Sequence, residues 1–216
     1  MKEEEDSLRS HRTWSEDIYS IPDGRKSVGT KWIFKLKHNE LGRIVRYKAR
    51  LVAKGFSQVE GQDYTDTFAP VMQSTTLRSL LSLAASENYE LHQIDVKTAF
   101  LYGDLDEDIY IKLPDGTIRK LQKAMYGLKQ ASRQFYKRFN ASLTKFGLTR
   151  CDTDPCCYFR NVNDQQMYVI IHVDDAVIIG DDIHRIEALK AALREEYVIE
   201  DMGEVKYCGT ISKGRV

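Results

Sequence analysis

Two neighbouring acids, Asp174 and Asp175, interrupt an otherwise apolar stretch of the chain. Residues 167–173 and residues 176–179 on either side are rich in β-branched side chains, which predicts a buried β-hairpin with two carboxylates at its tip. An unpaired charge beside an apolar core costs on the order of several kcal/mol, which a bound divalent cation would offset. The simpler alternative is that the two acids only close the turn, because Asp favours turns.

A third acid, Asp95, interrupts a second apolar segment at residues 91–96. If that segment is a strand beside the hairpin, Asp95 converges with Asp174 and Asp175. Carboxylate oxygens are hard ligands that suit Mg2+, with Mn2+ as an alternative. Two such ions about 3.5 to 4 Å apart serve in-line phosphoryl transfer, because one activates the attacking hydroxyl and the other stabilises the leaving group. The three acids therefore favour nucleotidyl transfer.

The charges of the chain are segregated, although its formal net charge is zero with 32 Lys or Arg and 32 Asp or Glu. Residues 25–54 contain ten basic residues against the single acid Glu40, and residues 117–150 contain nine basic residues and no acid. Acids collect instead at residues 104–108 and 174–201. This pattern fits a protein that binds a polyanion and cations together, although two solvated faces of an ordinary domain would give it too.

The composition predicts a soluble protein in a reducing compartment. A hydrophobic content of 42% is sufficient for a core, and no apolar run is long enough to cross a bilayer. The first six residues lack the basic and apolar parts of a secretory signal. The cysteines show no C-x-x-C spacing and no nearby His, so we expect reduced, mostly buried thiols and not a zinc site. They are Cys151, Cys156, Cys157 and Cys208.

A two-stranded finger is expected near the N-terminus. Residues 31–37 alternate between Lys and mostly apolar side chains, which predicts a half-buried strand with a basic outer face. Turn-forming residues 39–42 follow, and residues 44–52 predict a returning strand that is again basic on one side. The pair would carry cations.

The rest of the chain alternates between helices and strands. Helices are predicted at residues 75–86, 132–146 and 183–197, with Ser74 capping the first and Gly147 ending the second. The order helix, strand, helix, hairpin, helix, strand predicts an α+β fold. We expect an antiparallel sheet packed on helices on one face, in a split βαβ, ferredoxin-like plan, and not a doubly wound parallel sheet.

Several short motifs occur in one order along the chain. They are KARLVAKG at residues 48–55, DY at 63–64, TFAPV at 67–71, QIDVKTAFL at 93–101, YGLKQA at 126–131, VDD at 173–175 and MGE at 202–204. Together they resemble the reverse transcriptase of copia-type LTR retrotransposons, and the resemblance extends from about Trp14 to Ile211.

The resemblance implies the fingers and palm of a right-hand polymerase. Residues 1–90 would form an N-terminal segment and the fingers, and residues 91–216 the palm, with an inserted basic fingers or helix segment at about 115–150. The thumb and ribonuclease H portions of the polyprotein are expected to be missing.

The implied activity is RNA-directed DNA polymerisation, in which deoxynucleotides are added to a primer by two-metal nucleotidyl transfer. The implied partners are an RNA template, a DNA or tRNA primer, dNTPs and the missing thumb and ribonuclease H portions, without a membrane. The implied location is the cytoplasm, within a virus-like particle, with the nucleus as an alternative.

The resemblance also implies roles for the acids and their neighbours. Asp95 and Asp174 would bind both metal ions, the Val96 carbonyl would be a further ligand, and Asp175 would be a supporting catalytic carboxylate. Phe100 would lie under the incoming sugar and exclude a 2′-hydroxyl, and its alternative role is that of a plain core aromatic.

Other residues would contact nucleotide, template or primer. Nucleotide binding is implied, besides Phe100, for Lys37, Lys48, Arg50, Lys54, Gly127, Lys129 and Gln130. Contacts to the template or primer are implied for Arg133, Lys137, His172 and Gly209. For the basic residues, the alternative is an ordinary solvated surface side chain.

The chain departs from the family pattern at three places. His172 stands where the family has Tyr, Ser132 stands where it has Pro, and Cys208-Gly209 matches the primer-grip segment only in part. These positions are expected near the primer or template. The alternative function is therefore a catalytically inactive retrotransposon relic that acts only as a nucleic-acid-binding or interaction module.

Overall fold

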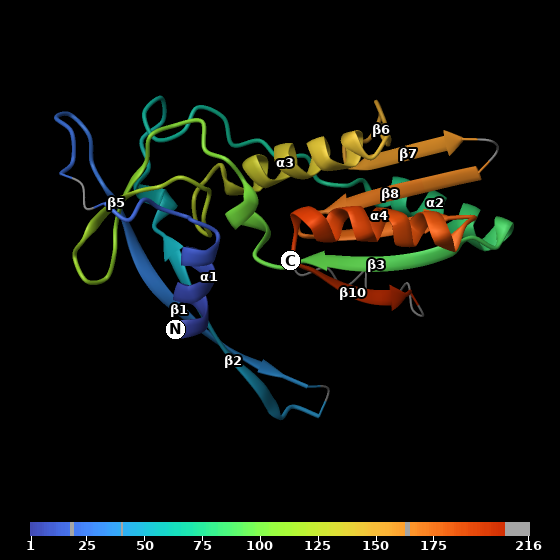
Figure 1. Ribbon diagram of the computed structural model, residues 1–216, viewed down its shortest axis with the longest axis horizontal. Helices are drawn as coiled ribbons and strands as arrows, with labels where there is room; N and C mark the ends of the chain where they lie inside the picture. Colours follow the sequence, from blue (N-terminus) through green and yellow to red (C-terminus); the bar gives the residue numbers. More distant parts are fainter. Residues whose placement is uncertain (18–19, 40, 163–164, 206–216) are drawn as a thin grey trace. The chain divides into compact units, whose positions relative to one another are not determined.

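The computed structural model shows a mixed α+β protein (Figure 1). It describes residues 1–17, 20–39, 41–162 and 165–205. Within these ranges, the expectation of an α+β fold with an antiparallel palm sheet is confirmed. No helix among the described residues is both long and apolar enough to cross a membrane.

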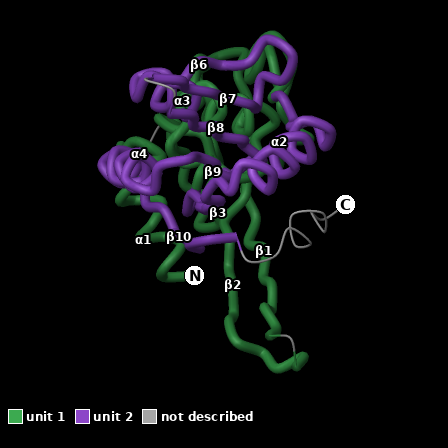
Figure 2. Tube along the Cα trace, turned by 90° about the vertical axis from the view of Figure 1, so that its right-hand side faces the viewer, with its two compact units in different colours: residues 1–69, 99–138 green, residues 70–98, 139–216 purple. Residues whose placement is uncertain are grey.

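The chain forms two compact units, and each unit consists of two separate stretches of the sequence (Figure 2). Unit 1 consists of residues 1–69 and 99–138, and unit 2 consists of residues 70–98 and 139–216. The division into fingers at residues 1–90 and a palm at residues 91–216, with an inserted segment at about 115–150, stays a prediction. Residues 70–90 belong to unit 2, and their helix packs on a strand of that unit.

Unit 1 is built on a four-stranded sheet of order β2-β1-β4-β5, in which only β1 and β4 are parallel. Its strands are β1 (Val28–His38), β2 (Ile44–Ala53), β4 (Tyr110–Lys112) and β5 (Ile118–Lys120). Its helical elements are α1 (Lys2–Ser10), the short 3-10 helices η1 (Gly55–Ser57) and η2 (Ala99–Tyr102), and the beginning of α3 (Ala131–Lys145).

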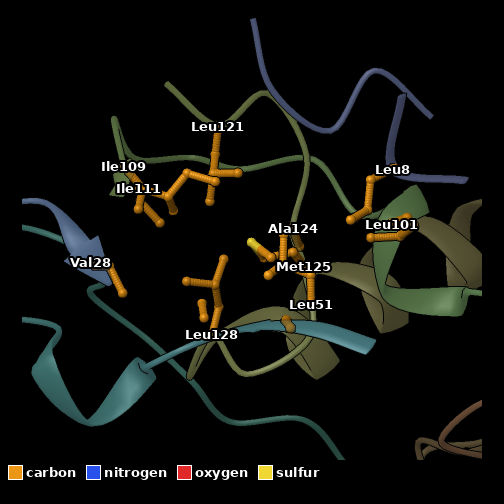
Figure 3. Close-up of a cluster of buried hydrophobic side chains, with 12 residues drawn as sticks. Leu8, Val28, Leu51, Leu101, Ile109, Ile111, Leu121, Ala124, Met125 and Leu128 are labelled. Carbon is orange, nitrogen blue, oxygen red and sulfur yellow. The ribbon is translucent and has the colours of Figure 1, made fainter. Parts of the chain in front are cut away.

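The core of unit 1 is drawn from both of its chain segments (Figure 3). Leu8, Val28 and Leu51 come from the first segment. The second supplies Leu101, Ile109, Ile111, Leu121, Ala124, Met125, Leu128 and Ala131. Burial of this apolar surface stabilises the unit.

The β1–β2 hairpin has one apolar face and one cationic face. Trp32 lies opposite Leu51 and Leu36 opposite Tyr47, whereas Lys35 lies opposite Lys48. The expected basic face is therefore confirmed. The expected burial of the other face is wrong over most of the hairpin, since Phe34 and Tyr47 are 66% and 76% exposed. Only the end of the hairpin near the core of unit 1 is buried.

Unit 2 contains a six-stranded antiparallel sheet of order β10-β3-β9-β8-β7-β6. Its strands are β3 (Glu90–Val96), β6 (Thr149–Arg150), β7 (Cys157–Val162), β8 (Gln165–His172), β9 (Asp175–Gly180) and β10 (Ile199–Glu204). Its helices are α2 (Ser74–Glu87), the remainder of α3, and α4 (Ile183–Glu196). The cap residue of α2 is Gln73, and the expected cap Ser74 is its first helical residue.

Helices cover both faces of this sheet, so the expectation of helices on one face is wrong. Val177 and Ile179 of β9 pack with Ala84 of α2. Gly180, whose side-chain position lies on the opposite face of the strand, approaches Ile186 of α4. Figure 2 shows α2 and α4 on opposite sides of β8, β9 and β3.

A buried lysine fastens α4 to the sheet. Lys190 is 1% exposed, and its ammonium lies 2.7 Å from Nδ1 of His92 in β3. The same ammonium lies 3.0 Å from a carboxylate oxygen of Asp201 in β10 and 2.8 Å from one of Glu187. Such a buried charge persists only with partners of this kind.

Candidate active site

Four ionisable side chains form a row across four adjacent strands of unit 2. In the register of the sheet, His172 of β8 lies opposite Asp175 of β9, Asp175 opposite Asp95 of β3, and Asp95 opposite Glu200 of β10. Directly opposed residues of antiparallel strands project to the same face of a sheet. The structure therefore brings Asp95 and Asp175, which are 80 residues apart in the sequence, to the same face.

The turn between β8 and β9 adds Asp174 to this row. Val173 and Asp174 form a two-residue turn, and the carbonyl of Asp174 accepts a hydrogen bond of 2.8 Å from the N–H of Val96. Val173 has a φ of +58°, which is unusual for a β-branched residue. The backbone bond attaches the turn to the end of β3, beside Asp95.

Crowding of negative charge is greatest at Asp175. Burial raises the pKa of its carboxyl, the charges of Asp174 and Asp95 raise it further, and a hydrogen bond from Gln93 and the charge of His172 oppose the shift. A raised pKa indicates that the surrounding residues do not fully compensate the carboxylate. The residues at this end of the sheet therefore compensate the negative charge of Asp175 only in part.

A lysine already compensates Asp95. The ammonium of Lys97 lies 2.7 Å from a carboxylate oxygen of Asp95 and also contacts Glu200. Burial alone would lower the pKa of Lys97, but the hydrogen bonds and charges of these two acids outweigh it and raise the pKa. A cation bound at Asp95 must displace this ammonium.

His172 brings an unused polar atom to the row. Its Nδ1 is buried and has no hydrogen-bond partner among the residues that the structure describes. Buried polar atoms are normally hydrogen-bonded, so this nitrogen is available to a ligand.

The donor atoms of the row fit a hard divalent cation in kind. Asp95, Asp174 and Asp175 supply carboxylate oxygens, and the end of β3 supplies the carbonyl of Val96. In the described part of the chain, however, no three His, Cys, Asp or Glu side chains are close enough together to enclose a metal ion.

The expected phosphate-binding cations of unit 1 lie on the cationic face of β1–β2. Lys37 pairs with Arg46, Lys48 with Lys35, and Arg50 lies on the same face opposite an apolar residue. Burial lowers the pKa of Lys48, and the neighbouring charges of Arg50, Lys37 and Arg46 lower it further. Like charges opposite one another destabilise a sheet, so this face favours an anion.

Acids of α1 partly neutralise this face. Glu3 lies 3.3 Å from Arg46, and the charge of Glu4 interacts with Arg50 and Lys48. Burial raises the pKa of Glu4, although the backbone of Leu51 and these cations oppose the shift. Met1–Glu4 also line a cavity of about 500 Å3 against β1 and β2.

Arg50, Tyr126 and Phe100 form a contiguous group in unit 1. The guanidinium of Arg50 lies 4.1 Å from the centre of the Tyr126 ring, and that ring meets Phe100 edge to face at 5.0 Å. Phe100 is partly buried and packs against the core of unit 1. The structure therefore brings two of the expected nucleotide-binding residues together through an aromatic ring.

Family comparison identifies the chain. The model of a family described as reverse transcriptase (RNA-dependent DNA polymerase) matches residues 11–212. The chain belongs to the reverse transcriptase family. The expectation of a reverse transcriptase of a copia-type retrotransposon polyprotein is therefore confirmed.

Curated relatives of this reverse transcriptase domain are transposon polyproteins. The chain is 41% identical over 212 residues to the retrovirus-related Pol polyprotein from transposon TNT 1-94 of Nicotiana tabacum, which covers 94% of this chain and 16% of that protein. It is 36% identical over 215 residues to the corresponding polyprotein from transposon RE1 of Arabidopsis thaliana, over 95% of this chain and 14% of that protein. The chain thus spans about a sixth of the length of these curated relatives.

Two solved reverse transcriptase structures are similar to the chain at 12% identity, each over 90% of its length. One is a prototype foamy virus protease-reverse transcriptase mutant, with a TM-score of 0.44 and 22% of that chain covered. The other is a foamy viral protease-reverse transcriptase in complex with double-stranded DNA, with a TM-score of 0.39 and 29% covered.

The loop at residues 126–131 of the reverse transcriptase domain is held by packing. Gly127 has a φ of +92°, and an added Cβ would lie 2.2 Å from the carbonyl oxygen of Ala53. Gln130 is fully buried, and its amide donates to the carbonyl of Asp63 at 2.7 Å. Both residues therefore shape the loop. Lys129 is exposed, and its ammonium donates to the Tyr64 hydroxyl at 2.9 Å.

The other residues expected to contact nucleotide, template or primer lie in different parts of the reverse transcriptase domain. Lys54 follows β2, and its N–H donates to the carbonyl of Gly29. Arg133 pairs with Asp66 at 2.9 Å and Lys137 with Asp106 at 2.7 Å, so a nucleic acid would compete with these acids. Gly209 and Cys208 lie outside the described residues.

Sequence reasoning missed three residues that belong to these groups. Lys97 compensates Asp95, Glu200 contacts the same ammonium, and Tyr126 joins Arg50 to Phe100. Lys97 could have been found, because it continues the two-residue period of β3 beyond Asp95. Glu200 depends on the register of β10, which the local sequence does not fix.

Proposed function

We propose that this reverse transcriptase domain extends a primer on an RNA template by transferring nucleotidyl groups from dNTPs. The row containing Asp95 and Asp175, with Asp174 in the adjoining turn, is the single observation that carries the proposal. Three acids at one end of a sheet supply the oxygen ligands that divalent cations need for nucleotidyl transfer.

The expected metal ligands have separate roles in this proposal. Asp95, Asp174 and the Val96 carbonyl would hold two Mg2+ ions, and Asp175 would support them. When bound, the ions would activate the primer hydroxyl and stabilise the leaving pyrophosphate. The residues of the row would therefore hold and orient the metal ions. Lys97 would leave Asp95 when a metal ion binds there.

The nucleotide would be held by residues of unit 1. Lys37, Lys48 and Arg50 share the cationic face of β1–β2, where charge-assisted contacts to phosphate oxygen are strong. A triphosphate would also relieve the repulsion between Lys35 and Lys48. Phe100 would exclude a 2′-hydroxyl from the sugar position.

Primer extension tests the proposal directly. Asp95→Asn and Asp174→Asn should each abolish extension of oligo(dT) on poly(A) with labelled dTTP, while circular dichroism shows an unchanged fold. Glu200→Gln is the matched control, because Glu200 lies in the same row but is not a proposed metal ligand. It should retain extension. Retained extension in either Asp variant would contradict the assignment.

Metal binding is measured separately from activity. Mn2+ should broaden the NMR amide signals at the end of β3 and in the 173–174 turn, because a paramagnetic ion relaxes nearby nuclei. The broadening should disappear in Asp174→Asn and persist in Glu200→Gln. Uniform broadening in all three proteins would exclude a site at the row.

A second candidate function is nucleic-acid binding without catalysis. The ion pair between Lys97 and Asp95 favours this second function, because the ammonium already neutralises part of the negative charge of the row. Binding to an RNA–DNA hybrid that weakens with salt, without extension in either Mg2+ or Mn2+, would support this function. Recovery of extension in His172→Tyr would show instead that the scaffold is intact and that one position limits activity.

A further inference from the structure

Two cysteines of unit 2 lie opposite each other where β6 meets β7. In the register of these strands, Thr149 pairs with Phe159 and Arg150 with Tyr158. The next step places Cys151 opposite Cys157, and the N–H of Cys151 donates to the carbonyl of Cys157 at 2.8 Å. The Cα atoms of such pairs are about 4.5 to 5.5 Å apart. That separation lies within the range of about 4.4 to 6.8 Å that a disulfide spans.

The two side chains also lie on the same face of the sheet. Cys157 is 6% exposed and belongs to an apolar cluster with Leu77 of α2 and Ile170 of β8. Cys151 is partly buried and packs against the same cluster. Both are free thiols in the structure. Their position and common surroundings allow a bond between the two sulfur atoms without a change of register.

The two thiols differ in reactivity. Cys151 is partly accessible to solvent, and its Sγ lies 3.1 Å from the hydroxyl of Thr153. This hydrogen bond, together with the backbone groups of Asp154 and Thr153, lowers the pKa of Cys151. Burial raises the pKa of Cys157 to about 11. A partly accessible cysteine with a lowered pKa beside a buried thiol is the usual arrangement of an oxidisable cysteine and its resolving partner.

We propose that Cys151 and Cys157 form a reversible dithiol–disulfide pair that responds to hydroperoxides. The thiolate of Cys151 attacks a peroxide oxygen, the O–O bond breaks, and a sulfenic acid forms as the peroxide is reduced to an alcohol or water. The sulfur of Cys157 then attacks the sulfur of Cys151. The S–S bond forms, the S–O bond breaks, and hydroxide leaves with the proton of Cys157 as water. An external thiol reverses the reaction by exchange.

The pair closes a loop that holds the beginning of α2. Asp154 lies within this loop and is 1% exposed. Its carboxylate accepts a hydrogen bond of 3.0 Å from the N–H of Gln73, the cap residue of α2, and another of 3.0 Å from the N–H of Cys156. Oxidation therefore fixes the support of α2 covalently and restricts the unfolded chain, so the oxidised protein should unfold at a higher temperature.

Peptide mass analysis tests the pair on the full chain. After hydroperoxide treatment, alkylation under denaturing conditions and trypsin digestion, a single peptide, residues 151–160, carries all three described cysteines. This peptide should lose the mass of two hydrogen atoms and take up one alkyl group, at Cys156. Treatment with a thiol before alkylation should restore three alkyl groups.

Acid cleavage of the bond between Asp154 and Pro155 shows whether the disulfide joins Cys151 to the second half of this peptide, and the Cys156→Ser variant then distinguishes Cys157 from Cys156. The two halves of the peptide should remain joined by a disulfide that crosses the cut. Separate halves would indicate a bond between Cys156 and Cys157, and a joined peptide containing Cys208 would indicate a different partner. Either result would overturn the proposal, as would three alkylated cysteines after peroxide.

Cys156 provides a matched control. It is adjacent to Cys157 and is 2% exposed, but it lies in the turn before β7, outside the strand register that continues to Cys151 and Cys157. Cys156→Ser should keep both the disulfide and the rise in unfolding temperature on oxidation. Cys151→Ser and Cys157→Ser should lose both. A disulfide that persists in Cys157→Ser, or that is lost in Cys156→Ser, would contradict the pair.

Discussion

Val173 is the residue at which sequence and backbone conformation conflict most clearly. Its φ of +58° places a β-branched side chain in the left-handed region, which costs on the order of 1 to 3 kcal/mol. The residue precedes Asp174, and the turn is attached to Val96 by a backbone hydrogen bond. The hydrogen bond from Val96 therefore holds this strained turn, and with it Asp174, beside the end of β3.

Glycine at this position should relieve the strain. Val173→Gly is expected to raise the free energy of unfolding by about 1 kcal/mol, since glycine adopts a positive φ readily but has a more flexible unfolded state. Urea denaturation measures the change. Val198→Gly is the control, because Val198 is also exposed, at 62%, but does not have a positive φ. It should destabilise the protein. Equal losses in both variants would refute strain at the turn.

The sequence identified the acidic residues because each interrupts an apolar strand. Asp95, Asp174 and Asp175 stand out against their neighbours, and the structure places Asp95 opposite Asp175. The partners of these acids were not predictable in the same way. The contact of Lys97 with Glu200 depends on how β10 pairs with β3, and that register is set by the folded sheet.

At the scale of elements, the position of α4 depends on a buried charge. Lys190 contacts Asp201 of β10, His92 of β3 and Glu187 of its own helix. Burial would raise the pKa of Asp201, but the N–H of Gly203 and the ammonium of Lys190 outweigh it and lower the pKa below its ordinary value of 3.8. An acid whose pKa is lowered by folding stabilises the fold at pH values above its ordinary pKa. This stabilisation is lost as the pH falls through the lowered pKa of the folded state.

Lys190→Met should therefore destabilise the protein in a pH-dependent manner. The expected loss is about 1 to 3 kcal/mol at pH 7, because His92 and Asp201 lose a partner while water reaches part of the Asp201 carboxylate. The difference from wild type should narrow as the pH falls from 3.8 through the lowered pKa of Asp201, because the carboxyl then takes up a proton in the folded wild type as well. Thermal or urea unfolding across the pH range measures it.

The variant Arg194→Met tests whether a buried and an exposed cation contribute differently when both contact Asp201. Arg194 also contacts Asp201, at 2.8 Å, but its side chain is 45% exposed, so its removal should cost much less. Losses of equal size in the two variants, or a gap that widens at low pH, would show that the buried ammonium is not what fastens α4.

The periodicity of the sequence predicted most elements close to their observed bounds, including α2, α3, α4 and the β8–β9 hairpin. It did not predict which apolar faces are covered. Phe34 and Tyr47 follow the same two-residue period as buried strand residues, yet no layer of unit 1 covers them. A local pattern specifies a face, and only the tertiary structure determines what packs against it.

At the scale of the whole molecule, the chain passes between the two units three times. The crossings fall between residues 69 and 70, 98 and 99, and 138 and 139. The second crossing divides the motif at residues 93–101, so Asp95 belongs to unit 2 and Phe100 to unit 1. Neither unit is a continuous stretch of sequence.

Fragments that end at residue 98 and at residue 138 should differ in whether unit 1 folds. Residues 1–98 lack the core residues of unit 1 that lie beyond residue 99, so this fragment should show neither cooperative unfolding nor dispersed amide signals. Residues 1–138 contain the complete core of unit 1 and should show both for that unit. Circular dichroism melts and two-dimensional NMR measure the difference. A cooperatively folded 1–98 fragment would mean that the division into units is incorrect.

The contact between two glycines also determines how mutational data on this domain should be understood. A side chain at Gly55 would approach the carbonyl oxygen of Gly127 to 2.1 Å, just as one at Gly127 would strike Ala53. Alanine at either position must force two backbone segments apart. A screen for the proposed primer extension would then score such a variant as inactive. Its misfolding would be mistaken for the loss of a contact to the incoming nucleotide.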